Sequence, residues 1–113
     1  MITREEVTTL LTQWHGGAKT ELEIWQWAEQ AKESGGAADV LVRDLVDNLA
    51  TLPFDMITTE DVPVMLDALR NPISEADLSV NLLWNHLDGI DTNGRREALR
   101  EHPFYGEFCD GMS

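Results

Sequence analysis

Residues 88–94, DGIDTNG, combine the acidic, amide and glycine residues that calcium-binding loops use. If Gly94 is the glycine at the sixth loop position, the first position falls on Gly89, which has no side-chain oxygen. The twelfth position falls on Arg100, where a calcium loop needs a bidentate glutamate. We therefore expect this segment to cap a helix rather than to bind calcium.

The other residues capable of chemistry are three histidines and one cysteine. His15, His86 and His102 are far apart, and none stands at metal-ligand spacing from another histidine or from the cysteine. Cys109 has the acidic neighbours Glu107 and Asp110, which raise the pKa of a thiol and make it a poor nucleophile. Phosphate-binding, dinucleotide-binding, zinc-protease and serine-hydrolase motifs are absent from the sequence. The sequence predicts no catalytic residue, no metal ligand and no cofactor, with a small enzyme or metal-binding protein left open as an alternative.

The chain has an excess of acid: 21 Asp and Glu against 8 Lys and Arg give a formal charge of −13 at pH 7. Most of the imbalance lies between positions 39 and 91, where the only cations are Arg43 and Arg70. A field of this sign repels nucleic acid and anionic membranes and attracts cationic molecules. We expect one negative patch that binds a basic protein, formed by Asp39, Asp44, Asp47, Glu60, Asp61 and Asp67. The alternative is a solvated face that only keeps the protein in solution.

Two tryptophans share one predicted helix but cannot share one face. Trp25 and Trp27 are about 200° apart around a helix, so Trp25 lies on the flank when Trp27 points to the core. Tryptophan is a preferred anchor at protein interfaces. We therefore add Trp25 to the candidate partner-binding residues. Coverage of both rings by neighbouring helices is the alternative.

Helix-start and helix-stop residues divide the chain into five or six short helices, and no segment has the alternating pattern of a strand. Capping boxes are expected at Thr3 and Thr20, and a further cap at Thr58. The third helix is expected over residues 37–52, with Asp39 pointing outward, and the sixth over residues 94–102. Phe104 begins a tail whose aromatic side chains are expected to dock on the helices. These patterns predict that residues 1–113 form one all-α domain, a bundle of mostly antiparallel helices.

Apolar residues recur every three to four positions in each predicted helix, which is typical of a helix with one buried face. The stripes are Val7, Leu10, Leu11 and Trp14; Ile24, Trp27, Ala28 and Ala31; Leu41, Leu45, Leu49 and Leu52; Val62, Met65, Ala68 and Leu69; Val80, Leu83, Trp84 and Leu87. Because Leu78 and Leu82 widen the last stripe, we expect the fifth helix to be the central one. Glu60 and Asp61 are expected to be exposed acids that complement the positive end of the fourth helix.

The N-terminal residues lack the basic and apolar blocks of a signal peptide, and no apolar run approaches the ~20 residues of a membrane span. The single cysteine excludes an intramolecular disulfide. These features predict a cytoplasmic protein that is a monomer or a weak homodimer.

Two N-terminal segments carry a resemblance to a known class: residues 3–14, TREEVTTLLTQW, and residues 21–29, ELEIWQWAE, separated by a glycine-rich break. They resemble small acidic helical bacterial immunity proteins of contact-dependent inhibition and colicin-like systems. The resemblance implies a cytoplasmic inhibitor that neutralises a cognate basic toxin domain, often a nuclease, by shielding its nucleic-acid-binding cleft. It carries over no functional residue. An adaptor module without a toxin partner is the alternative.

Overall fold

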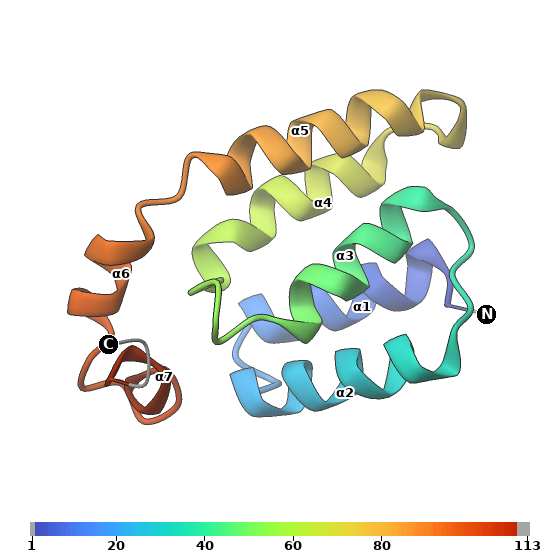
Figure 1. Cartoon of the computed structure of the whole chain (residues 1–113). Helices are drawn as coiled ribbons and strands as arrows, with labels where there is room; N and C mark the ends of the chain where they lie inside the picture. The colour runs from blue at the N-terminus through green and yellow to red at the C-terminus, as the bar shows by residue number, and fades with distance from the viewer. Residues whose placement is uncertain (1, 111–113) are drawn as a thin grey trace.

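The computed structural model describes residues 2–110, without the side chains of Ile73, Cys109 and Asp110, so the expectation for Cys109 lies outside the described part. Helices make up most of this part (Figure 1). In chain order they are α1 (Arg4–His15), α2 (Glu21–Ser34), α3 (Val40–Ala50), the 3-10 helix η1 (Thr59–Asp61), α4 (Val62–Arg70), η2 (Ile73–Glu75), α5 (Ala76–Asp88), α6 (Thr92–Ala98) and α7 (Gly106–Asp110). The all-α class is confirmed, with seven α-helices in residues 2–110 rather than five or six.

Side-chain caps begin the first two helices where the sequence predicts them. The hydroxyl of Thr3 accepts a hydrogen bond from the amide of Glu6 at 3.2 Å. Thr20 and Glu23 form a complete capping box at the start of α2. That helix ends at Gly35, whose φ of 76° is a left-handed conformation that glycine adopts without a clash of a Cβ. These local hydrogen bonds explain why the first two helices follow the prediction.

The third helix begins at Val40, three residues later than predicted. Asp39 is its N-cap and accepts a hydrogen bond from the amide of Val42 at 3.1 Å. The segment before Asp39 pairs instead with Ile2: the amide of Ile2 donates to the carbonyl of Gly36 at 2.9 Å, and its carbonyl accepts from the amide of Ala38 at 2.8 Å. The predicted start at residue 37 is therefore wrong, because a long-range pairing holds this segment extended.

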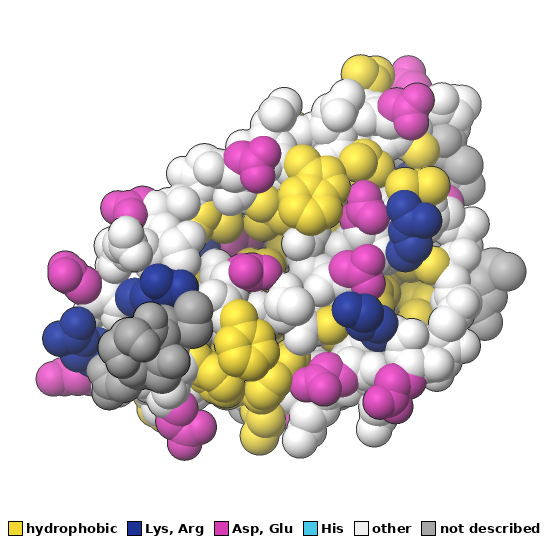
Figure 2. All heavy atoms as spheres, in the orientation of Figure 1, with side chains coloured by type: hydrophobic (Ala, Val, Ile, Leu, Met, Phe, Trp, Pro, Cys, Tyr) yellow, Lys and Arg dark blue, Asp and Glu magenta, His cyan; other side chains and the backbone are white. Residues whose placement is uncertain are grey.

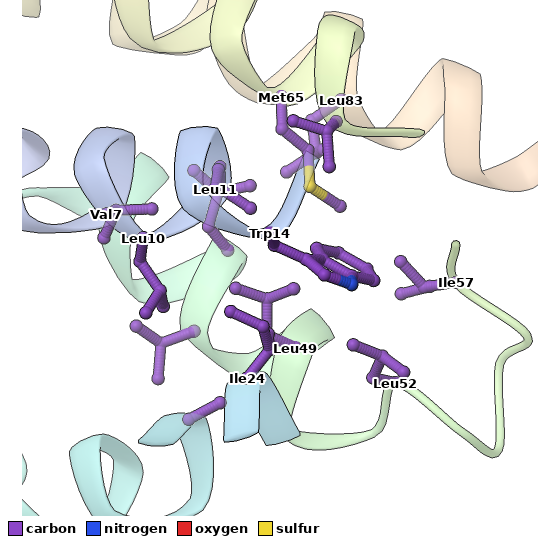
Figure 3. Close-up of a cluster of buried hydrophobic side chains, with 14 of the residues drawn as sticks. Val7, Leu10, Leu11, Trp14, Ile24, Leu49, Leu52, Ile57, Met65 and Leu83 are labelled. Carbon is purple, nitrogen blue, oxygen red and sulfur yellow. The ribbon is translucent and has the colours of Figure 1, made fainter. Parts of the chain in front are cut away.

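The core has α3 at its centre, with α2, α4 and α5 packed against it and α1 against α2 and α4 (Figure 1). Six of the eleven residues of α3 are buried. Trp14 of α1 lies in the middle of the core, between residues of the four other long helices (Figure 3). Those fully buried neighbours are Ile24 of α2, Leu49 of α3, Met65 of α4 and Leu83 of α5. The apolar stripes predicted for α1, α3 and α4 are all buried.

The fifth helix is at the edge of the bundle, and the expectation that it is central is wrong. Within α5 only Ser79 and Leu83 are buried. Leu78, Leu82 and Trp84 stay exposed because α5 packs mainly on α4 and α3, which cover one side of it (Figure 1). A stripe too wide for one buried face thus marks a helix with apolar residues in solvent, not a helix surrounded by others.

The C-terminal segment extends beyond the end of α5 and folds back as α6 and α7 (Figure 1). Asp91 caps α6, accepting from the amide of Gly94 at 3.0 Å, so the helix starts at Thr92 and not at residue 94. Tyr105 is buried and its hydroxyl donates to the carbonyl of Ile57. Docking of the aromatic tail on the helices is therefore confirmed, and it contains a further short helix that the sequence did not predict.

Candidate partner-binding surface

The six acidic residues predicted to contact a partner lie on several elements, and each has a cationic side chain of the chain itself within 4.0 Å. The pairs are Asp39 with Arg4 (2.8 Å), Asp44 with Arg43 (3.6 Å), Asp47 with Lys32 (4.0 Å), Glu60 with Arg95 (3.9 Å), Asp61 with Arg95 (2.7 Å) and Asp67 with Arg70 (3.0 Å). On the face in Figure 2, acidic side chains are scattered among neutral and apolar ones. The structure does not bring the six carboxylates together into one uncompensated patch.

Asp61 was expected to be exposed, and that expectation is wrong: its side chain is fully buried. One oxygen, Oδ2, accepts from Arg95 at 2.7 Å and from the amide of Thr58 at 2.9 Å. The other, Oδ1, lies 3.0 Å from Arg95 Nη2 and 2.7 Å from His86 Nε2. Burial alone raises the pKa of Asp61, but hydrogen bonds from Arg95, Thr58 and His86 together lower it below its ordinary value. The carboxylate connects α6, α5 and the start of α4.

Asp39 was expected to point outward, which is also wrong, since its carboxylate is nearly buried. It caps α3 and accepts from Arg4 Nε at 2.8 Å, while Arg4 Nη1 donates to the carbonyl of Asn71 at 2.6 Å. Burial raises the pKa of Asp39, but the hydrogen bonds from Arg4 and from the amide of Val42 bring it below its ordinary value. The pair of Asp39 and Arg4 therefore links α1 to the start of α3 and to the end of α4, which is a structural role.

Trp25 lies on the flank of α2, as predicted, but neighbouring segments half-bury its ring. Its Nε1 donates to the carbonyl of Ala50 at 2.8 Å. The ring packs edge-on against Phe54, Phe104 and Phe108 at centroid distances of 6.0, 5.8 and 5.4 Å. Trp25 therefore connects α2 and the end of α3 to the C-terminal segment, and its surroundings explain its position without a partner.

A hollow of about 320 Å³ between α2, η1 and the C-terminal segment contains the most reactive side-chain types of the fold. Glu21 accepts from Trp14 Nε1 at 2.7 Å and lies 3.6 Å from His102 Nε2. His102 Nδ1 accepts from the amide of Phe104 at 3.0 Å, so its ring proton is on Nε2 and faces Glu21. Burial raises the pKa of Tyr105. These groups mainly form hydrogen bonds within the chain, and they hold the C-terminal segment against α2 and η1.

The outer side of α5 carries three large apolar side chains that the described part of the fold leaves partly exposed. Leu78 and Leu82 are 61% and 42% exposed, and Trp84 is 40% exposed. At 100° per residue these side chains border an arc that contains Asp77 and Asp88, both exposed. We call these five residues the α5 face. Trp84 Nε1 donates to Asp44 Oδ2 at 3.2 Å, so Asp44 is the predicted acid that adjoins it.

The α5 face was not predicted from the sequence, because Trp84 has the spacing of the core stripe. The signal was present: seven of thirteen positions in α5 are apolar, more than one buried face of an edge helix can take up. Leu78 and Leu82 are one helical turn apart and adjoin one another, while Trp84 lies across the exposed side of α5 from them. Exposed large apolar side chains gathered on one helix mark an interaction surface.

No family model matches the chain, and no curated protein or solved structure is significantly similar to it. Within residues 2–110, no three His, Cys, Asp or Glu side chains are grouped so that they can hold a metal ion. None of the helices in that range is both long and apolar enough to cross a membrane.

Proposed function

We propose that this chain is a binding protein for a cationic protein and that the partner docks on the α5 face. The observation that supports this most is the exposure of Leu78, Leu82 and Trp84 on one edge helix. Full burial of such a side chain stabilises by roughly 1.5–3 kcal/mol, and since 40–61% of each is exposed, a partner that covers one gains about 0.6–1.8 kcal/mol. Tryptophan is the residue type that contributes most often to the affinity of protein interfaces.

Charge favours a cationic partner over a second copy of the chain. Asp77 and Asp88 lie within the α5 face, and neither has a Lys, Arg or His nitrogen within 4.0 Å among the described side chains. Two chains of charge −13 repel one another, whereas a basic partner is steered towards the same surface. The affinity comes from the apolar side chains, and the acids contribute the association rate and its dependence on salt.

The resemblance of residues 3–29 to immunity proteins makes a basic toxin domain the specific partner that we propose. In that case the chain acts as a cytoplasmic inhibitor and not as an enzyme. The six acids predicted from the sequence to bind a partner contribute to the long-range field, but of these six Asp44 is the one that adjoins the docking surface. An adaptor role differs from this proposal in one respect: its cationic partner has no toxic activity.

Photo-crosslinking in the native host tests the proposal. A photoreactive amino acid replaces Leu82, which is on the α5 face, or Leu22 on α2, which is 46% exposed and serves as the matched control. We expect a covalent product with a basic protein from the Leu82 position and none from the Leu22 position. The captured protein is then purified and its binding is measured by calorimetry at low and high salt.

Three results decide between the readings. A basic protein that binds more weakly at high salt, and that stops growth when expressed without this chain, supports the inhibitor. A basic protein without toxicity supports the adaptor. An acidic partner, or equal capture from the Leu22 position, contradicts the docking of a cationic protein on the α5 face.

A further inference from the structure

A hollow of about 190 Å³ lies at one end of the α5 face, where the C-terminal ends of α3 and α5 come together. Its lining includes Asn48 of α3, Asp55 from the following turn, and Trp84 and Asp88 of α5. Resting on the proposed function, we infer that this hollow binds an arginine side chain of the cationic partner. The guanidinium stacks on Trp84 and is neutralised by Asp55 and Asp88.

The hollow has a negative potential from two sources. Two carboxylates line it, and no lysine or arginine is among its lining residues, all of which are described. In addition, α3 and α5 both end here, and the C-terminal end of a helix carries the negative pole of its dipole. Asp88 is the last residue of α5, so its charge adds to that pole instead of compensating it. The free protein tolerates an unfavourable charge that a bound cation relieves.

Asn48 gives an independent indication of a ligand. Its exposed fraction is 6%, and its side-chain Nδ2 has no hydrogen-bond partner in the described part of the chain. Burying an amide without a partner costs stability, so such groups are rare. The unpartnered group is a donor, so the carbonyl groups of the peptide that carries the arginine, and not the guanidinium itself, supply its acceptor.

Arginine fits the hollow better than lysine for reasons of geometry. A guanidinium is planar, stacks on an indole ring and reaches more than one carboxylate through its five N–H donors. The apolar residues Ile57, Leu87 and Ile90 also line the hollow and suit the methylene stem of arginine. The ammonium of lysine keeps more water and makes a single point contact.

Titration of the full chain, labelled with nitrogen-15, with N-acetyl-L-arginine amide tests this inference by NMR. We expect saturable shifts of the Trp84 indole N–H and of the Asn48 side-chain amide, with a Kd of about 1 mM, as befits a ligand of this size. N-acetyl-L-lysine amide should bind at least about threefold more weakly. N-acetyl-L-glutamine amide and sodium chloride at equal ionic strength should give no saturable shift.

Two substitutions on α5 form the matched pair. Asp88→Asn should raise the Kd for the arginine amide by about fivefold, because it removes a charge-assisted contact. In the free protein it should raise Tm by about 2 °C, since a negative charge leaves the C-terminal end of the helix. Asp77→Asn removes the same charge in the first turn, so it should leave the Kd unchanged and slightly lower Tm.

Opposite results overturn the inference. It is wrong if the arginine and lysine amides give equal shifts spread over all acidic residues, or if Asp88→Asn leaves the Kd unchanged. Neither result affects the crosslink from Leu82, so the docking of a partner on the α5 face survives them. Loss of that crosslink with the arginine titration intact refutes the docking of a partner on the α5 face, and it leaves the hollow as an arginine-binding site whose arginine comes from elsewhere.

Discussion

Replacing Asp61 with asparagine removes one charge from a fully buried position and leaves its shape almost unchanged. The guanidinium of Arg95 stays charged in its largely buried place, bonded to the carbonyl of Met56 at 3.0 Å but without its carboxylate partner. Removal of one member of a buried ion pair costs about 3–5 kcal/mol. Because Glu60 remains 3.9 Å from Arg95 and Arg95 keeps some contact with water, we expect about 3 kcal/mol.

That loss is large compared with the stability of a domain, which is about 5–15 kcal/mol. An unfolding entropy of about 2.1 cal/mol/K for each residue corresponds to roughly 0.24 kcal/mol/K for 113 residues. The Asp61→Asn protein should therefore unfold about 12 °C below the unsubstituted protein. At 25 °C most of it should still be folded.

Urea unfolding at pH 7, followed by far-ultraviolet circular dichroism, measures this difference. Asp67→Asn is the matched control: Asp67 also pairs with an arginine, Arg70, at 3.0 Å, but both side chains are mostly exposed. Such surface pairs contribute about 0.5 kcal/mol or less. Equal losses for the two substitutions would refute the reasoning that burial makes the Asp61 pair important. A double-mutant cycle with Arg95→Met should give a coupling free energy above about 1 kcal/mol.

The other predictions concern pH, the core and one turn. Folding lowers the pKa of Asp61, so the stability that its ionised carboxylate contributes is complete above the ordinary pKa of 3.8 and is lost as pH falls through the folded pKa. The difference in unfolding free energy between the unsubstituted and Asp61→Asn proteins should therefore shrink below about pH 4, as measured by urea unfolding from neutral to acid pH. Leu11→Ala should cost about 2–5 kcal/mol because Leu11 is fully buried, whereas Leu22→Ala should cost under about 1 kcal/mol; equal thermal shifts would contradict the assignment of the core. Gly35→Ala should lower the free energy of unfolding by about 1 kcal/mol because φ is 76° there, while Gly89→Ala, with φ of −86° and only ordinary contacts, should change it by under about 0.5 kcal/mol in the same urea assay.

Short-range sequence patterns predicted helix caps and buried faces well, because the residues that form them are close in sequence. The box of Thr20 and Glu23 joins residues three positions apart, and the apolar stripe from Val7 to Trp14 needs only the period of one helix. The same local reasoning failed for α5. Leu78 and Leu82 have the spacing of core residues, but whether a helix side is covered depends on how many neighbours pack around it.

The candidate site was predicted less well than the fold, for an electrostatic reason. A count of acids gives the net charge but not the cations that fold against each one. Arg4 is 35 residues from Asp39, and Arg95 is 34 residues from Asp61, so both pairings depend on packing of distant segments. Asn48 gave no signal in the sequence, since an unpartnered amide is recognised only when its surroundings are known.

The amino-acid sequence by itself determined the helical class, the starts of the first two helices and the strongly acidic charge, because caps, apolar periodicity and composition act within a few residues or over the whole chain. Only the tertiary structure decided which carboxylates are neutralised inside the fold, that α3 and not α5 is the central helix, and that Trp84 stays partly exposed beside Asp44. These outcomes depend on contacts between segments far apart in the chain, and the free energy of an ion pair or an apolar side chain is set by how much water those contacts exclude.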